Sequence, residues 1–203
     1  KLEYQTSFAS GIHPYSYTVT FGDITAHSFK RHQESSNGLQ LDSTWQCQSD
    51  GLAAMQYGDL SMPETRLKLD TQRAGGVTLP SAAKWQKGAK WSNSYEVTGQ
   101  MSLGGPRPVD VQGTISVANE IVAEETVTVP AGTYDAFKVV STITQDLSLR
   151  NTRAAPIRMS FGSSSWYVKD VGMVKALSQD LKSTTVLSAV AAGDEAVTGF
   201  PVK

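Results

Sequence analysis

Two neighbouring segments of alternating apolar and polar residues constrain the fold of this chain more than any other feature. Residues 91–103 carry mostly apolar side chains at odd positions and polar ones at even positions, and residues 109–121 repeat the pattern. A period of two places alternate side chains on opposite faces of a β-strand. Residues 104–108 read Gly-Gly-Pro-Arg-Pro and cannot continue a strand. The sequence therefore predicts a long β-hairpin with a five-residue loop.

The apolar positions also predict a register for this hairpin. A shift by one residue would set the polar face of one strand against the apolar face of the other. Opposing glycines would permit a bend in the middle of the hairpin. The apolar side chains of the two strands would then lie together on the concave face of a curved sheet. The predicted pairs are Leu103 with Val109, Met101 with Val111, Gly99 with Gly113, Val97 with Ile115, Tyr95 with Val117, Asn93 with Asn119 and Trp91 with Ile121.

Similar alternation extends over most of the chain. Helix is expected only as a turn over residues 82–87. These features predict an all-β fold with a single domain over residues 1–203, built on one large, curved antiparallel sheet of about nine to eleven strands, as a half-barrel or incomplete barrel. The further strand candidates are residues 15–21, 24–29, 39–47, 52–57, 122–129, 137–149, 157–168, 171–174 and 181–190.

Composition excludes several classes of protein. The formal net charge is −1 and charged residues make up 18% of the chain, which argues against a basic nucleic-acid-binding face and an acidic disordered tail. A single cysteine excludes an internal disulfide, and no apolar run is long enough for a membrane-spanning helix. The chain begins with Lys1 rather than Met, which is consistent with removal of a signal or lipobox peptide and export to the periplasm or cell surface. The alternative is a sequence simply trimmed at that point.

Candidate catalytic and metal-binding residues are few. His13, His27 and His32 have none of the spacings of a metal or catalytic motif. Cys47 has no accompanying signature and is interpreted as a buried, inert thiol. The carboxylates of residues 124–125 leave opposite faces of a strand, so they cannot form a catalytic pair by themselves. The expectation is a non-enzymatic protein with no catalytic residue, metal site or cofactor.

Three lysines alternate with tryptophans near the first hairpin strand. Lys84, Lys87 and Lys90 lie beside Trp85 and Trp91. The favoured interpretation is a solvated face. Contact with an anionic membrane surface, aided by a lipid anchor, is the alternative, and nucleic-acid binding is not expected.

Two motifs in the C-terminal half resemble a known group of proteins. Residues 127–139 (VTVPAGTYDAFKV) and 165–175 (SWYVKDVGMVK) resemble the paired motifs of exported bacterial proteins and lipoproteins of unknown function, and residues 85–91 are similar to a strand entry of that group. The resemblance covers about residues 79–182. It implies an extracytoplasmic location and a shape like the LolA/LolB half-barrel, whose concave face can hold acyl chains. Lipid binding follows only by analogy with these more distant relatives.

The apolar stripe of the hairpin is the most informative functional feature. It predicts either a packed core or a concave groove for an apolar or lipid-like ligand. The sequence therefore leaves three functions open: a non-catalytic extracytoplasmic binding protein, a structural or interaction module of the envelope with a filled core, and, least favoured, a hydrolase. The predicted wall of the groove consists of Trp91, Tyr95, Val97, Met101, Ile115 and Phe137.

Overall fold

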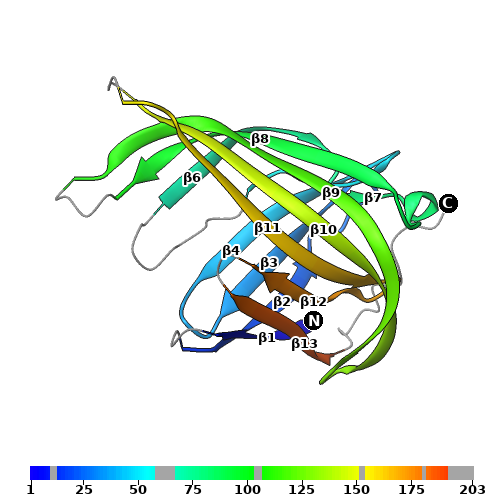
Figure 1. Cartoon of the computed structure of the whole chain (residues 1–203). Coiled ribbons are helices and arrows are strands. Elements are labelled where there is room, and N and C mark those ends of the chain that lie inside the picture. The colour runs from blue at the N-terminus through cyan, green and yellow to red at the C-terminus, as the bar shows by residue number, and fades with distance from the viewer. Residues whose placement is uncertain (10–12, 58–66, 103–106, 151–153, 180–181, 192–203) are drawn as a thin grey trace.

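The computed structural model is one antiparallel sheet of 13 strands with a single short 3₁₀ helix (Figure 1). It describes residues 1–9, 13–57, 67–102, 107–150, 154–179 and 182–191. The strands are β1 (Leu2–Phe8), β2 (Tyr15–Gly22), β3 (Ser28–Ser35), β4 (Gln40–Gln48), β5 (Gly51–Ala54), β6 (Leu67–Gly76), β7 (Leu79–Pro80), β8 (Lys90–Met101), β9 (Val109–Val129), β10 (Gly132–Leu149), β11 (Ile157–Val168), β12 (Gly172–Ser178) and β13 (Ser183–Val190), and the 3₁₀ helix η1 covers Ala82–Lys84.

The sheet is strongly curved and remains open. Its strand order is β6-β8-β9-β10-β11-β12-β13-β1-β2-β3-β4-β5-β7. In Figure 1 the long ribbons of β8 to β11 arch over the strands β1 to β4 and enclose a concave side. This architecture confirms the predicted fold class. The strand number exceeds the expected nine to eleven because β1, β6 and the two-residue β7 were not among the strand candidates.

The two edge strands of the sheet are close to each other in the sequence. β6 and β7 form opposite margins and are separated only by Val77 and Thr78. Gly76 makes this corner with a φ of 76°, and a Cβ there would lie 2.3 Å from the carbonyl oxygen of Ser92. Only glycine tolerates both the left-handed backbone and the close approach.

The predicted register of the first hairpin is wrong by two residues. Met101 pairs with Val109, Val97 with Gly113 and Tyr95 with Ile115. A shift by two preserves the buried face, because the side-chain period is two, but it lengthens the connection to residues 102–108. Leu103 and residues 104–106 of the predicted loop lie outside the described residues, as does Leu181 at the start of the last predicted strand.

The two glycines of this hairpin do not oppose each other. Gly99 pairs with Val111, and a Cβ on Gly99 would lie 1.9 Å from the carbonyl oxygen of Lys68 on β6. A Cβ on Gly113 would lie 1.9 Å from the carbonyl oxygen of Asp146 on β10. Each glycine therefore allows a different neighbouring strand to approach closely, which supports the coiling of the sheet.

The segments predicted at residues 109–121 and 122–129 form one strand, β9. Its 21 residues would extend to roughly 70 Å if straight, well beyond the diameter of a compact chain of this size. The pairing of β9 with β10 is irregular between Lys138 and Val139, where Val122 has no partner. Such a bulge increases the local twist and bends the strand.

The short helix is smaller than expected. The predicted turn over residues 82–87 is reduced to the 3₁₀ helix η1, and Gly88 follows it in the left-handed region. No helix in the described part of the chain is long and apolar enough to cross a membrane.

Candidate functional site: the concave face of the sheet

Four of the six predicted wall residues belong to a tightly packed core. The exposed fractions of Tyr95, Val97, Met101 and Ile115 are 4%, 2%, 5% and 0%. Val97 and Ile115 are diagonal neighbours rather than a direct pair, and both lie in the same buried cluster. The other buried members of this cluster are Leu69, Val111 and Leu147. The four predicted wall residues of this cluster therefore belong to the filled, inner part of the sheet.

The other two predicted wall residues pack around Trp85, at the end of η1. The Trp85 ring centroid lies 6.0 Å from that of Trp91, 5.6 Å from that of Phe137 and 5.6 Å from that of Tyr167. The indole of Trp85 donates to the carbonyl oxygen of Pro80 at 3.0 Å. Trp85 therefore joins strands β8, β10 and β11. In the sequence, only the spacing of Trp85 from Trp91 pointed to this aromatic contact.

A second group of aromatic residues lies on β2, β3 and β4 and was not predicted from the sequence. The Phe21 ring centroid lies 5.8 Å from that of Phe29, which stacks on Trp45 at 5.9 Å and 12°. Phe21 shares a strand face with the buried Tyr17 and Val19, so this aromatic row continues the core face of the sheet. Phe21 is nevertheless 40% exposed, and Phe29 and Trp45 are half-buried. We call these three residues the aromatic row.

Arg31 lies on the same face as the aromatic row. It pairs with Phe21 on β2 and with Ser43 on β4. The guanidinium donates from Nη2 to Oε1 of Gln33 at 2.8 Å. Within the described parts of the chain, no salt bridge involves Arg31, whereas Arg73 and Arg158 pair with Glu96 and Asp146.

Three tyrosines surround this arginine. Burial lowers the pKa of Arg31, and the nearby Tyr17, Tyr4 and Tyr167 partly oppose that effect. Burial likewise raises the pKa values of the three tyrosines, so their hydroxyls stay protonated. Tyr167 belongs to β11, with four strands between it and β3 in the sheet. Its influence on Arg31 is therefore exerted across the concave side.

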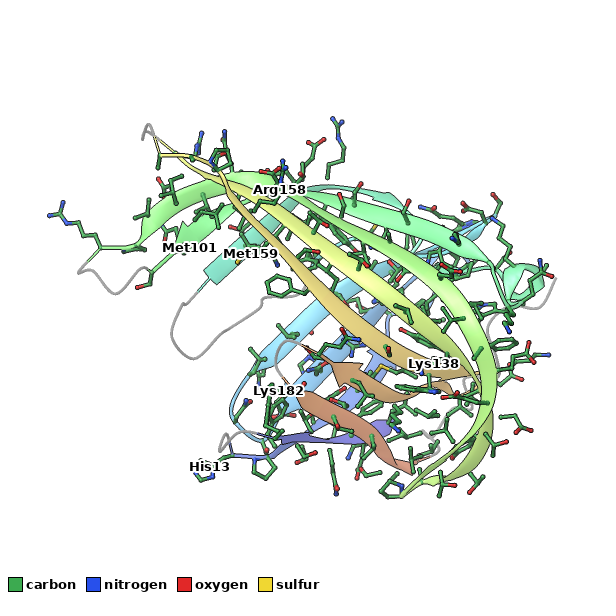
Figure 2. The ribbon with its side chains drawn as sticks, in the orientation of Figure 1. His13, Met101, Lys138, Arg158, Met159 and Lys182 are labelled. Carbon is green, nitrogen blue, oxygen red and sulfur yellow. The ribbon has the colours of Figure 1, made fainter. Side chains whose placement is uncertain are left out.

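The opposite wall of the concave side is formed by β10 and β11. Met159 is half-buried and pairs with Gln145, whereas the preceding Arg158 is exposed and forms an ion pair with Asp146. Figure 2 shows Arg158 above the ribbon and Met159 below it, toward the enclosed side. Phe161 lies on the same strand face as Met159 and is also half-buried.

Gln145 is a buried polar group on this wall. It is 1% exposed and donates to the Tyr57 hydroxyl at 3.4 Å, and its Oε1 has no hydrogen-bond partner among the described residues. Buried polar atoms normally have partners. The amide oxygen of Gln145 is therefore an unused hydrogen-bond acceptor in this wall.

The two sequence motifs of the C-terminal half meet at Trp166. The side-chain nitrogens of Lys138 and Lys175 lie 5.1 Å and 4.8 Å from the Trp166 ring centroid. The indole donates to Oε1 of Glu125 at 2.6 Å. Cations over an indole face are attracted by its quadrupole. These motifs thus hold β9, β10, β11 and β12 together.

The remaining candidates from the sequence are dispersed. His32 Nδ1 lies 2.7 Å from Oδ1 of Asp42, and His13 and His27 are exposed. The described residues contain no group of three or more His, Cys, Asp or Glu side chains that could hold a metal. Cys47 is half-buried, so its predicted burial is wrong in degree.

The three lysines near the first hairpin strand are exposed. Lys90 forms an ion pair with Glu120 at 3.1 Å, and Lys84 and Lys87 are also exposed. Lys90 and Glu120 line a shallow, open depression. Both occupy the strand positions that alternate with those of the buried Tyr95 and Ile115, which places this depression on the opposite face from the core.

A family model described as DUF3108-like matches residues 75–188, more than half of the chain. The chain belongs to the DUF3108-like family. The match includes both C-terminal motifs and Trp85. It confirms that these residues resemble a known protein family. The aromatic row and Arg31 lie in the N-terminal part, outside the DUF3108-like match.

Solved structures with the same fold come from two bacteria. A protein assigned as exported, with a YmcC-like fold, from Bacteroides fragilis is 15% identical with a TM-score of 0.55, and 94% of each chain is covered. A protein assigned as a lipoprotein from Parabacteroides distasonis is 17% identical with a TM-score of 0.52, again over 94% of each chain. At these identities the likeness concerns the fold alone. No curated protein matches the sequence. The predicted likeness to the LolA/LolB half-barrel stays a prediction.

Proposed function

We propose that this DUF3108-like protein is a non-catalytic extracytoplasmic binding protein that holds an apolar or lipid-like ligand on the concave face of its sheet. The location is supported by the two structures of the same fold, one assigned as exported and one as a lipoprotein. A lipid anchor at the membrane surface is part of this proposal.

The observation that carries the proposal is the aromatic row. Its three rings lie on the core face of β2 to β4 yet remain accessible, and Phe21 is 40% exposed. Half-buried apolar residues also lie on the core face of β11, at Met159 and Phe161. Covering such surface is worth about 25 cal/mol per Å² of apolar area, so an alkyl chain gains about 0.8 kcal/mol per buried methylene.

The predicted wall residues have two roles in this proposal. Tyr95, Val97, Met101 and Ile115 form the packed back of the wall, where their low exposure leaves little surface for a ligand. Trp91 and Phe137 lie with Trp85 at the margin of the ligand site. Direct contacts come chiefly from the aromatic row and the core face of β11.

Binding of the neutral apolar probe 1-N-phenylnaphthylamine, followed by its fluorescence, tests this function. We expect the wild-type protein to bind it and the double variant F29A/W45A to bind at least tenfold more weakly. Ile24→Ala is the matched control, because Ile24 is 56% exposed and lies outside the aromatic row. Equal binding by the double variant, or no binding by the wild type, would contradict the proposal.

A second candidate is a structural or interaction module of the envelope with a filled core. The complete burial of Val111, Ile115 and Leu147 favours it. Solvent extraction of the protein purified from its native envelope, followed by mass spectrometry, separates the two functions. A co-purifying lipid-like molecule supports the binding protein, and its absence together with failure to bind the probe supports the module.

A further inference from the structure

We propose that Arg31 binds the head group of the ligand, which makes the ligand an anionic amphiphile: an alkyl chain that ends in a carboxylate or a phosphate. This inference rests on the proposed function and adds the charge of the ligand to it.

The first argument is the isolation of the Arg31 charge. Arg73 and Arg158 are exposed and each lies beside a carboxylate, whereas Arg31 is half-buried and only the Gln33 amide oxygen accepts from its side chain within the described parts of the chain. The ionisable groups that influence the pKa of Arg31 are tyrosines rather than carboxylates, and these tyrosines are protonated and neutral. A guanidinium stays charged at any physiological pH, so this cation has no counter-ion among the residues that the structure describes.

The second argument is geometric capacity. A guanidinium has five N–H donors in a planar fork that matches the oxygens of a carboxylate or a phosphate. The contact with Gln33 uses one of these donors. The protonated hydroxyl of the nearby Tyr17 is a further donor toward an anion.

The third argument is the apolar surface beside the charge. Phe21 is the direct cross-strand neighbour of Arg31, and Phe29 lies two residues before it on the same strand face. Phe29 stacks on Trp45, which continues the apolar surface onto β4. A cation at one end of an aromatic row fits a molecule with one charged end and one apolar chain.

The experiment compares ligands that share a twelve-carbon chain and differ in head group. Dodecanoate, dodecyl phosphate, neutral monododecanoylglycerol and cationic dodecyltrimethylammonium are titrated below their critical micelle concentrations by calorimetry. We expect the two anions to bind the wild-type protein about tenfold to hundredfold more tightly than the neutral lipid, the range that a charged hydrogen bond provides. The cation is expected to bind most weakly. Dodecanoate and dodecyl phosphate distinguish the two head groups, and acetate and inorganic phosphate test whether the head group binds without a chain, which we do not expect.

Arg31→Gln and the matched control Arg73→Gln assign the preference to its residue. We expect R31Q to lose the preference for anions and to keep the affinity for monododecanoylglycerol, and R73Q to behave like the wild type. An equal affinity of the wild type for neutral and anionic lipids, or a preference retained in R31Q, would overturn the role of Arg31 and leave the proposed function intact. Failure of all four lipids to bind would overturn both. If R31Q does not fold, Arg31→Met takes its place, and a preference for anions retained in that variant would overturn the role of Arg31.

Discussion

At the scale of single residues, two glycines allow neighbouring strands of this sheet to approach more closely than any residue with a side chain would permit. Gly99 and Gly113 each face the carbonyl group of an adjacent strand at a distance that excludes a Cβ atom. Side chains at these positions would push β6 or β10 away and flatten the sheet. The curvature that creates the concave face thus depends on residues without side chains.

Gly113→Ala tests this dependence. The added Cβ would lie 1.9 Å from the carbonyl oxygen of Asp146, a backbone atom that cannot rotate away, so we expect a loss of about 3 kcal/mol in the free energy of unfolding. Gly75→Ala is the matched control in a strand, since the nearest atom there is Ser94 Oγ at 3.6 Å. Urea unfolding measures both variants. Similar midpoints for the two would show that β10 adjusts and that Gly113 does not set the curvature.

Arg31 also has a consequence for stability at this scale. A cation that is partly buried without a counter-ion is costly, and its replacement by an apolar side chain of similar length is often neutral or stabilising. We therefore expect Arg31→Met to raise the free energy of unfolding by about 1 kcal/mol in the absence of ligand. Chemical denaturation of the ligand-free protein provides the measurement. A large decrease would mean that Arg31 holds the fold together, contrary to a role in binding.

At the scale of strands, alternation in the sequence predicted which face of the two hairpin strands is buried, but it did not predict how far one strand slides along the other. Val97 and Ile115 are both buried as expected, yet they are offset by two residues. The reason is physical, because a slide by two leaves every side chain on its own face. The bulge at Val122 and the aromatic row were likewise missed, since both depend on the exact register between neighbouring strands, which alternation leaves open.

The contact at Trp166 links several strands, and the sequence did not predict it: the two motifs gave a family resemblance but no contact between them. We expect Trp166→Phe to lower the free energy of unfolding by about 2 kcal/mol, because it removes the hydrogen bond to Glu125 and weakens the contact with both lysines. Trp45→Phe is the matched control, since its indole donates to the hydroxyl of Ser43 and no cation from the described residues lies over its ring. Thermal unfolding compares them. An effect of W166F no larger than that of W45F would remove Trp166 as the link between β10, β11 and β12.

At the scale of the whole molecule, the open sheet is held at its margins by side chains as well as by strand pairing. The backbone N–H of Ala54 donates to Thr78 Oγ1 at 2.9 Å, and that of Tyr57 donates to Thr71 Oγ1 at 2.9 Å. These bonds join the β5 side of the sheet to the β6 side. The two margins of the sheet are therefore linked although their strands do not pair, and the concave side carries several tyrosines.

The buried tyrosines predict how the whole fold responds to alkaline pH. Burial raises the pKa values of Tyr4, Tyr17, Tyr57 and Tyr167 above the ordinary value of about 10, so the folded protein keeps these protons at a pH where the unfolded chain loses them. Because the native state then binds more protons, the contribution of these tyrosines to the free energy of unfolding is constant below about pH 10 and falls above it, by up to about 1.4 kcal/mol per pH unit for each such tyrosine. Urea midpoints between pH 8 and 12 measure this slope. We expect Tyr17→Phe to make the slope shallower by about the contribution of one tyrosine. If absorbance at 295 nm shows these tyrosines ionising near pH 10 in the folded protein, water reaches their hydroxyls. The concave face would then not be dry, which would contradict the proposed binding of a lipid-like ligand there.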